Sequence, residues 1–179
     1  MILVSISDFS GFQRLSTNAF DTSLLQAYID RYEKELIMKL LGAELGQLFI
    51  DDLANVSQDP RFVAIQDEFY IDYDDKIHHS RGLVDMLVSM IYYCYTKDTS
   101  VRHTTTGAAK VALEGRTNKQ DVDQSRFGEK KWNDAVLTAE EIQWYITIYA
   151  PDTFTISDPD MLYPEYNGQK YTAAFSAIL

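Results

Sequence analysis

Residues 80–97 read SRGLVDMLVSMIYYCYTK and contain the most regular hydrophobic pattern in the chain. Apolar side chains recur here at every third or fourth position, which places them on one face of an α-helix. The members of this stripe are Leu83, Met86, Leu87, Met90, Ile91 and Cys94. A helix with one apolar face buries it against other elements, so this stretch predicts a core helix of a helical bundle.

Other stretches combine helical spacing with signals for helix ends. Asp21 and Ser23 offer caps for a helix that Gly42 ends with a left-handed residue. Asp59-Pro60 is a second start signal, because proline at the first helical position sacrifices no hydrogen bond. The predicted core helices lie near 22–41, 43–54, 60–70, 80–97 and 120–149. The predicted fold class is therefore mainly α, a small bundle of four to five helices.

The last of these helices has one internal ambiguity. Thr138 and Glu141 have the spacing of a capping box, which would divide it into two helices. The apolar stripe continues across this point, and we therefore favour a single helix that ends before Pro151. The residues predicted to be buried in the bundle are Leu25, Ile29, Leu36, Leu40, Leu87, Ile91, Trp132 and Ile146.

Two segments lack a helical stripe but contain apolar and aromatic side chains. Residues 98–118 predict an extended loop or hairpin within a helical domain spanning 1–150, because Thr-rich sequence around Gly107 favours extended backbone and a turn. Residues 151–179 predict an irregular C-terminal arm. We expect both segments to make contacts between subunits. The candidate interface residues are Val101, Arg102, Lys110, Val111, Leu113, Phe154, Tyr163, Tyr166, Tyr171 and Phe175.

Composition restricts the classes of partner. The 179 residues have a formal net charge of −11, which opposes tight or sequence-specific binding to nucleic acid. The first ten residues do not resemble a secretory signal, and no stretch has the roughly 20 apolar residues of a membrane span. The single cysteine cannot form an internal disulfide. We expect a protein that folds in a reducing cytoplasm and does not enter a membrane.

Charge is distributed unevenly along the chain. Residues 51–75 contain eight acids and one base, a balance of −7. Residues 100–131 contain seven bases and four acids, a balance of +3. Two solvated faces would explain this pattern. The alternative is that the two segments meet between neighbouring subunits, which favours head-to-tail assembly.

The sequence contains no recognisable catalytic, metal-binding or phosphate-binding motif. A calcium loop starting at Asp72 would need glycine at Ile77 and a carboxylate at Leu83, and both positions fail. His78 and His79 are adjacent and would diverge on a helix. No zinc-ligand spacing, nucleophile elbow or phosphate-binding loop occurs. We therefore predict no catalytic residues, no metal and no cofactor, which elemental analysis of the purified protein would test.

Three stretches resemble the head–tail connector (adaptor) proteins of tailed phages, especially those of crAss-like and related gut phages. The first contains Ile6-Ser7-Asp8-Phe9, Ser16-Thr17-Asn18, Leu25, Tyr28-Ile29, Leu40-Leu41-Gly42-Ala43-Glu44-Leu45 and Phe49. The second contains Gly82-Leu83-Val84-Asp85-Met86-Leu87, Tyr92-Tyr93-Cys94-Tyr95 and Gly107. The third contains Trp132-Asn133-Asp134-Ala135-Val136, Ile142-Gln143-Trp144-Tyr145-Ile146 and Tyr163-Pro164-Glu165-Tyr166-Asn167-Gly168. The likeness covers most of the chain and departs from it at 150–162 and in the last ten residues.

This resemblance implies a structural virion protein rather than an enzyme. Such subunits form a ring, usually of twelve copies, that docks on the portal protein, contacts a downstream neck or tail protein and lets DNA pass through. The implied location is the head–tail junction of the virion, after assembly in the host cytoplasm. Three alternatives remain open at this point: another neck or tail-completion ring protein, a small soluble enzyme, or an interaction module.

Overall fold

The structure is a computed structural model that describes residues 3–9, 22–99, 101–104, 107–110, 118–150 and 152–154. Its helical elements are a 3-10 turn η1 (Ile6–Phe9), α1 (Thr22–Leu41), α2 (Ala43–Asp52), α3 (Pro60–Gln66), α4 (Gly82–Thr99), α5 (Asn118–Trp144) and a π-helical turn η3 (Tyr145–Tyr149). Its strands are β1 (Phe69–Tyr73), β2 (Lys76–Ser80), β3 (Val101–Thr104) and β4 (Gly107–Lys110). The predicted mainly α fold class is confirmed.

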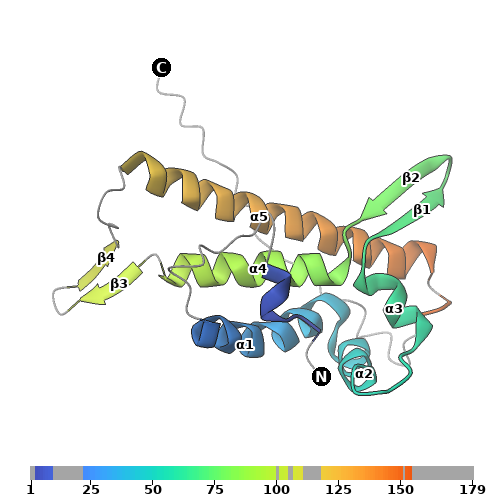
Figure 1. Ribbon diagram of the computed structural model, residues 1–179. Coiled ribbons are helices and arrows are strands. Elements are labelled where there is room, and N and C mark those ends of the chain that lie inside the picture. The colour runs from blue at the N-terminus through green and yellow to red at the C-terminus, as the bar shows by residue number, and fades with distance from the viewer. Residues whose placement is uncertain are drawn as a thin grey trace.

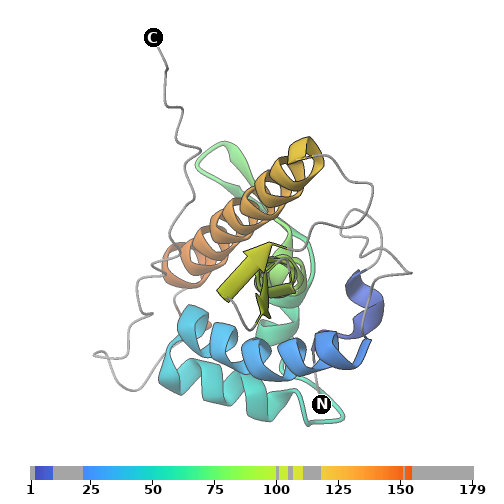
Figure 2. The ribbon, with the colours of Figure 1, turned by 90° about the vertical axis from the view of Figure 1, so that its left-hand side faces the viewer.

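Helix α4 lies at the centre of the bundle. It runs beside α5 along the length of the molecule, and it also contacts α1, α3 and η1 (Figures 1 and 2). Leu83, Met86, Leu87, Met90 and Ile91 are all fully buried, as the stripe predicts. Cys94 lies at the edge of this face and is half-buried.

The burial predicted for the other helices is largely correct. Seven of the eight predicted residues are buried: Leu25, Ile29, Leu36, Leu40, Leu87, Ile91 and Ile146. Trp132 is the exception, because it is only partly buried and packs on the core from its edge, with its ring 5.1 Å from that of Tyr93. Gly42 has the positive φ, 81°, that its position between α1 and α2 predicts.

The long C-terminal helix is one element up to Trp144 and continues directly into η3, so it is not divided at the Thr138–Glu141 capping-box spacing, as we predict. Thr138 is 3% exposed, and its hydroxyl donates to the carbonyl oxygen of Asp134 at 3.2 Å, one turn earlier. This bond satisfies the buried hydroxyl inside a continuous helix, where a cap would require a break.

The prediction of a helix over 60–70 is wrong in its second half. The helix ends at Gln66, and residues 69–73 pair antiparallel with residues 76–80. Asp74 and Asp75 form the two-residue turn with φ of 54° and 57°, and positive φ at both positions is the mark of a type I′ hairpin turn. The acidic run Asp72-Tyr73-Asp74-Asp75 therefore forms the end of β1 and the turn of a β-hairpin.

The position of Phe154 differs from the prediction that it is an interface residue of the C-terminal arm. Its side chain is 2% exposed and lies 6.4 Å from the ring of Phe62 and 6.1 Å from that of Tyr145. These contacts place Phe154 in the core of its own chain, so it is not part of an exposed surface for a neighbouring subunit. The Phe154 ring therefore contacts both α3 and η3.

A buried carboxylate attaches the N-terminal segment to α1. Glu33 is 4% exposed, and its Oε1 accepts hydrogen bonds from the backbone N–H groups of Leu3 at 2.6 Å and Val4 at 2.8 Å. Burial raises the pKa of Glu33, while the two N–H donors act in the opposite direction. The bonds hold Val4 and Phe9 in the core, where both are buried.

Replacing Glu33 with alanine should lower the free energy of unfolding by about 1–3 kcal/mol, because two backbone donors lose their acceptor. Glu33→Gln retains an Oε1 acceptor and should cost less. Because the folded-state pKa is raised, the stabilisation linked to protonation is present below the ordinary value of 4.5 and is lost as pH rises through the folded-state pKa. Urea unfolding across this pH range should show a smaller pH dependence for Glu33→Gln than for the wild type. Equal pH profiles would contradict the assignment.

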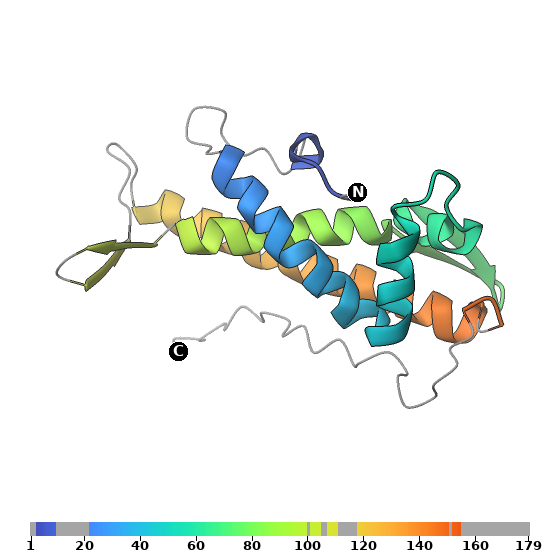
Figure 3. The ribbon, with the colours of Figure 1, turned by 90° about the horizontal axis from the view of Figure 1, so that it is seen from below.

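The two β-hairpins lie at opposite ends of an elongated molecule. The β1–β2 hairpin extends from the end where α2 and α3 lie, and the β3–β4 hairpin extends from the other end, beyond α4 (Figures 1 and 3). Helices α4 and α5 span the distance between them. Within the described residues, no helix combines the length and apolar character needed to cross a bilayer.

Candidate interaction site at the first hairpin

A pocket of about 320 Å³ lies between the β1–β2 hairpin and the second half of α5. It is lined by Phe69, Ile71, His78, His79, Ser80, Leu137, Glu140, Glu141 and Trp144. Apolar and aromatic groups form most of its wall, and two carboxylates belong to it. We call this recess the hairpin pocket.

Strand alternation explains how the hairpin supplies one wall. The pairs Phe69–Ser80, Ile71–His78 and Tyr73–Lys76 share one face of the ribbon because directly opposed residues point to the same side. This face lies against α5 and η3. The imidazole of His78 stacks on Trp144 at 4.4 Å, and the rings of Phe69 and Tyr145 lie 5.1 Å apart.

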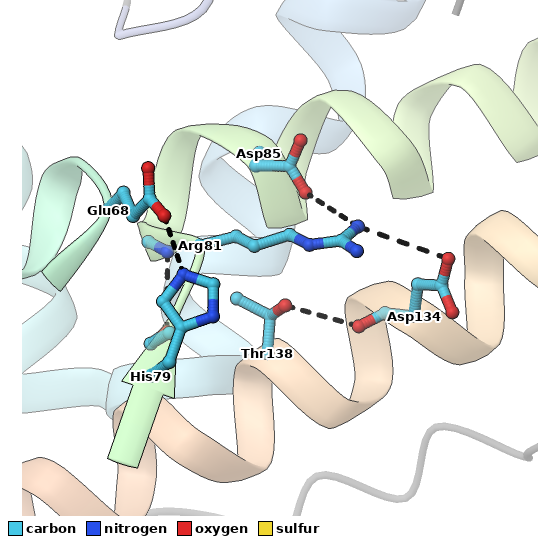
Figure 4. Close-up of polar contacts among 8 residues, drawn as sticks. Glu68, His79, Arg81, Asp85, Asp134 and Thr138 are labelled. Carbon is cyan, nitrogen blue, oxygen red and sulfur yellow. Dashed lines mark hydrogen bonds and ion pairs between the residues drawn. The ribbon is translucent and has the colours of Figure 1, made fainter. Parts of the chain in front are cut away.

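The other face of the hairpin is exposed and polar, with aromatic rings. Glu68 Oε1 pairs with His79 Nε2 at 2.7 Å (Figure 4). The same oxygen accepts a hydrogen bond from the Tyr70 hydroxyl, also at 2.7 Å. The rings of Tyr70 and His79 also stack at 4.6 Å. The hydrogen bond from Tyr70, followed by that from His79, lowers the pKa of Glu68. Glu68 is therefore a carboxylate at neutral pH and adds negative charge beside the pocket.

The pocket itself is acidic. Of the described residues that line it, Glu140 and Glu141 are carboxylic acids and none is lysine or arginine. Burial raises the pKa of Glu141, and the nearby His79 and Arg81 oppose this effect. The arrangement joins apolar walls to negative charge, which suits a group with an aliphatic body and a positive end.

Arg81 forms ion pairs with carboxylates of α4 and α5 close to the hairpin. Arg81 lies between β2 and α4, and its guanidinium is 3.9 Å from Asp85 Oδ2 on α4 and 4.0 Å from Asp134 Oδ2 on α5 (Figure 4). Both pairs are partly exposed, so their individual contributions are small. Together they connect the residue that precedes α4 to both α4 and α5.

The side chains best suited to nucleophilic chemistry are poorly placed for it. Ser80 belongs to the lining of the pocket but is only 1% exposed. Its Oγ accepts a hydrogen bond from the backbone N–H of Gly82 at 3.3 Å, and its side chain also hydrogen-bonds with Glu141. Burial raises the pKa of the Cys94 thiol to about 11, so the reactive thiolate is scarce at neutral pH. Among the described residues, no three His, Cys, Asp or Glu side chains are placed to share a metal ion. His78 and His79 lie on a strand rather than a helix, and they still diverge.

Large apolar side chains remain exposed around the pocket. Tyr70 is 66% exposed and Ile77 is 77% exposed on the hairpin, and Leu137 is 49% exposed on α5. Ile148 and Tyr149 extend this surface along η3. Tyr70 and Ile77 lie on the outer face of the hairpin, whereas Leu137 lines the pocket. Exposed rings and aliphatic groups close to an acidic recess have the character of a protein contact surface.

The predicted interface residues lie elsewhere. Val101 and Arg102 are on β3 and Lys110 is on β4, in the hairpin at the opposite end of the molecule. The remaining candidates lie outside the described residues, apart from Phe154 in the core: Val111, Leu113, Tyr163, Tyr166, Tyr171 and Phe175.

Sequence reasoning did not find the hairpin pocket. The available signal was the concentration of aromatic residues in two distant stretches, 69–73 and 144–149, which the fold brings together. No protein-family model, curated protein or solved structure matches this chain.

Proposed function

We propose that this chain is a structural subunit of a tailed-phage virion, a head–tail connector that forms a ring on the portal and joins the capsid to the tail. The ring leaves a passage for DNA, and the subunit catalyses nothing. One observation carries the assembly part of this proposal: the acidic and basic segments lie at opposite ends of an elongated subunit. The phage context comes from the resemblance of the three sequence stretches.

The position of the charged segments supports contacts between unlike ends. Residues 51–75, with their balance of −7, include the end of α2, all of α3 and β1 at one end of the molecule (Figure 1). The described part of 100–131 comprises β3, β4 and the first half of α5 at the other end. Head-to-tail contacts of this kind generate a closed ring when the rotation between subunits closes.

The overall charge is compatible with a DNA passage. A net charge of −11 repels the phosphate backbone, so DNA can move through a ring of such subunits without adhering to it. The rigid part of each subunit is the helical bundle. We expect the hairpins at its two ends to contact neighbouring subunits.

The mass of the assembly tests the proposal. Light scattering or native mass spectrometry of the purified chain, alone and with a portal ring, should reveal a ring of twelve copies of the 20.5 kDa subunit. Electron microscopy should place that ring coaxially on the portal. The gene is expected to lie close to portal and capsid genes.

Two results would redirect or overturn the proposal. A ring that ignores the portal but binds another neck component would indicate a tail-completion protein. A chain that stays monomeric, both alone and with the portal, would overturn the ring. Hydrogen exchange adds a local readout, because residues 98–118 and 155–179 should exchange more slowly after assembly if they make subunit contacts.

A further inference from the structure

We infer that the β1–β2 hairpin is a lid over one side of α5 and η3, and that it opens as a unit while the helical bundle stays folded. The inference goes beyond the proposed connector function, because it concerns a motion within one subunit and holds with or without a ring. Three features of the hairpin carry it: a narrow base, packing outside the main core, and few polar connections to the bundle.

The two ends of the hairpin meet at its base. The backbone of Asp67 lies so close to Gly82 that a Cβ on Gly82 would be 2.2 Å from the Asp67 carbonyl oxygen. Residues 68–81 therefore leave the bundle and return to it at one point (Figure 1). Hinge motions are absorbed by a few residues at the ends of elements, often small ones. Asp67, which follows α3, and Gly82, which begins α4, are suited to this role.

The inner face of the hairpin packs outside the main hydrophobic core. Ile71 is 5% exposed but does not belong to the cluster of buried residues that joins α1, α4 and α5. It lies on the wall of the hairpin pocket, a recess of about 320 Å³ within the contact between hairpin and α5. Close-packed interiors contain few voids larger than a water molecule, so this contact is looser than the packing around α4. Phe69, at the base, does pack on the core and marks the end of the firm attachment.

The outer half of the hairpin is held by contacts between rings. His78 stacks on Trp144, with the two ring centres 4.4 Å apart. Tyr73 makes edge contacts with Trp144 at 5.3 Å and with Tyr149 at 6.3 Å. Each such contact is individually weak, and none of them requires the helices to move when it breaks.

Polar connections between the hairpin and the bundle are concentrated at the base. Among the described residues, no backbone hydrogen bond connects residues 69–79 to another element. The side chains of Ser80 and Glu141 form a hydrogen bond between the end of β2 and α5. Ser80 also accepts from the backbone N–H of Gly82. The base is therefore fixed, while the rest of the ribbon is free of polar tethers to α5.

Opening separates the inner face of the hairpin from α5 and leaves the helices in place. Helix α4 keeps its contacts with α1, α3 and α5, and Ile71 and the face of Trp144 that stacks on His78 become accessible. A two-stranded hairpin without packing is only marginally stable in water, so its amides exchange with solvent once it leaves α5. Amide exchange in β1 and β2 therefore reports the opening.

Native-state hydrogen exchange of the full chain in low urea tests the inference. We expect the slowest amides of β1 and β2 to be protected at least about tenfold less than those of α4. Their exchange should depend only weakly on urea, because opening exposes much less surface than global unfolding does. Identical protection and identical urea dependence in the hairpin and in α4 would overturn the lid, because the hairpin would then open only when the whole domain unfolds.

Mild variants identify the contacts that control the opening. Ile91→Val, at a fully buried position of α4, should lower the protection of α4 by about 2- to 12-fold and leave that of the hairpin unchanged. Ile71→Val should lower the protection of β1 and β2 by a similar factor, because its packing is lost on opening. Ile77→Val is the matched control, because Ile77 lies on the same hairpin but is 77% exposed.

Two outcomes with these variants would also overturn the lid. A loss of hairpin protection in Ile91→Val equal to the loss in α4 would mean that the hairpin opens together with the core. Equal losses in Ile71→Val and Ile77→Val would mean that packing on α5 does not limit the exchange. A chain that stays monomeric contradicts the connector function and leaves the lid intact, so the failures of the two proposals are distinguishable.

Discussion

Replacing Gly82 with alanine is expected to lower the free energy of unfolding by about 2–5 kcal/mol, through backbone strain and overlap of atoms. Gly82 is the first residue of α4 and has a φ of 81°, a region that L side chains rarely adopt. A Cβ at this position would overlap the carbonyl group of Asp67 and lie 2.6 Å from the carbonyl oxygen of Gln66. Both neighbours are backbone and cannot rotate away.

The same substitution is expected to disturb the hairpin pocket. The contact between Gly82 and residues 66–67 joins the start of α4 to the end of α3, immediately before β1 and immediately after β2. Displacing α4 there separates the hairpin from the bundle. Gly82→Ala should therefore also weaken assembly if the hairpin pocket is an interface.

Gly128→Ala is the matched control. Gly128 lies inside α5, and a Cβ there would meet the Tyr93 ring at 3.4 Å and the Thr96 hydroxyl at 3.7 Å, which is ordinary contact. Alanine in a helix interior is favoured over glycine by about 0.5–1 kcal/mol. Thermal and urea unfolding should therefore shift in opposite directions for the two variants. Equal small shifts would contradict the strain at Gly82.

Helix positions were predictable because the signals are local. The apolar stripe of 80–97, the glycine at position 42 and the Asp59-Pro60 start each act within one or two turns of the helix they define. The hairpin was not predictable in the same way. Phe69 continues the helical spacing of Phe62 and Ile65, and the turn contains Asp-Asp in place of the glycine that usually marks a type I′ turn.

The candidate site depends on contacts between distant parts of the sequence. The stacking of His78 on Trp144 joins residues that are far apart in the chain, and no spacing rule connects them. The burial of Phe154 was not predictable for the same reason, because its contacts are with residues that are distant in the sequence or in another element. Its own segment has no helical stripe and predicts an interface residue, but Phe154 completes a core formed by α3 and η3.

Replacing Leu87 with alanine should remove about 2–5 kcal/mol of stability, the range for a fully buried leucine. Leu87 is 0% exposed and belongs to α4, the helix that contacts most other elements. Because α1 and α5 both pack on α4, the surroundings can close around the cavity only by disturbing two helix contacts at once. We therefore expect little relaxation and a value that is well above that of a surface substitution.

Leu48→Ala provides the same chemical change without burial. Leu48 is 45% exposed on α2, and alanine is at least as good a helix former as leucine, so its unfolding free energy should stay within about 0.5 kcal/mol of the wild type. Urea unfolding of both variants, with the slope of the transition compared, separates lost packing from a change in the unfolded chain. A loss for Leu87→Ala no larger than that for Leu48→Ala would mean that α4 is not the centre of the core, and the arrangement of both hairpins around it would then have to be revised.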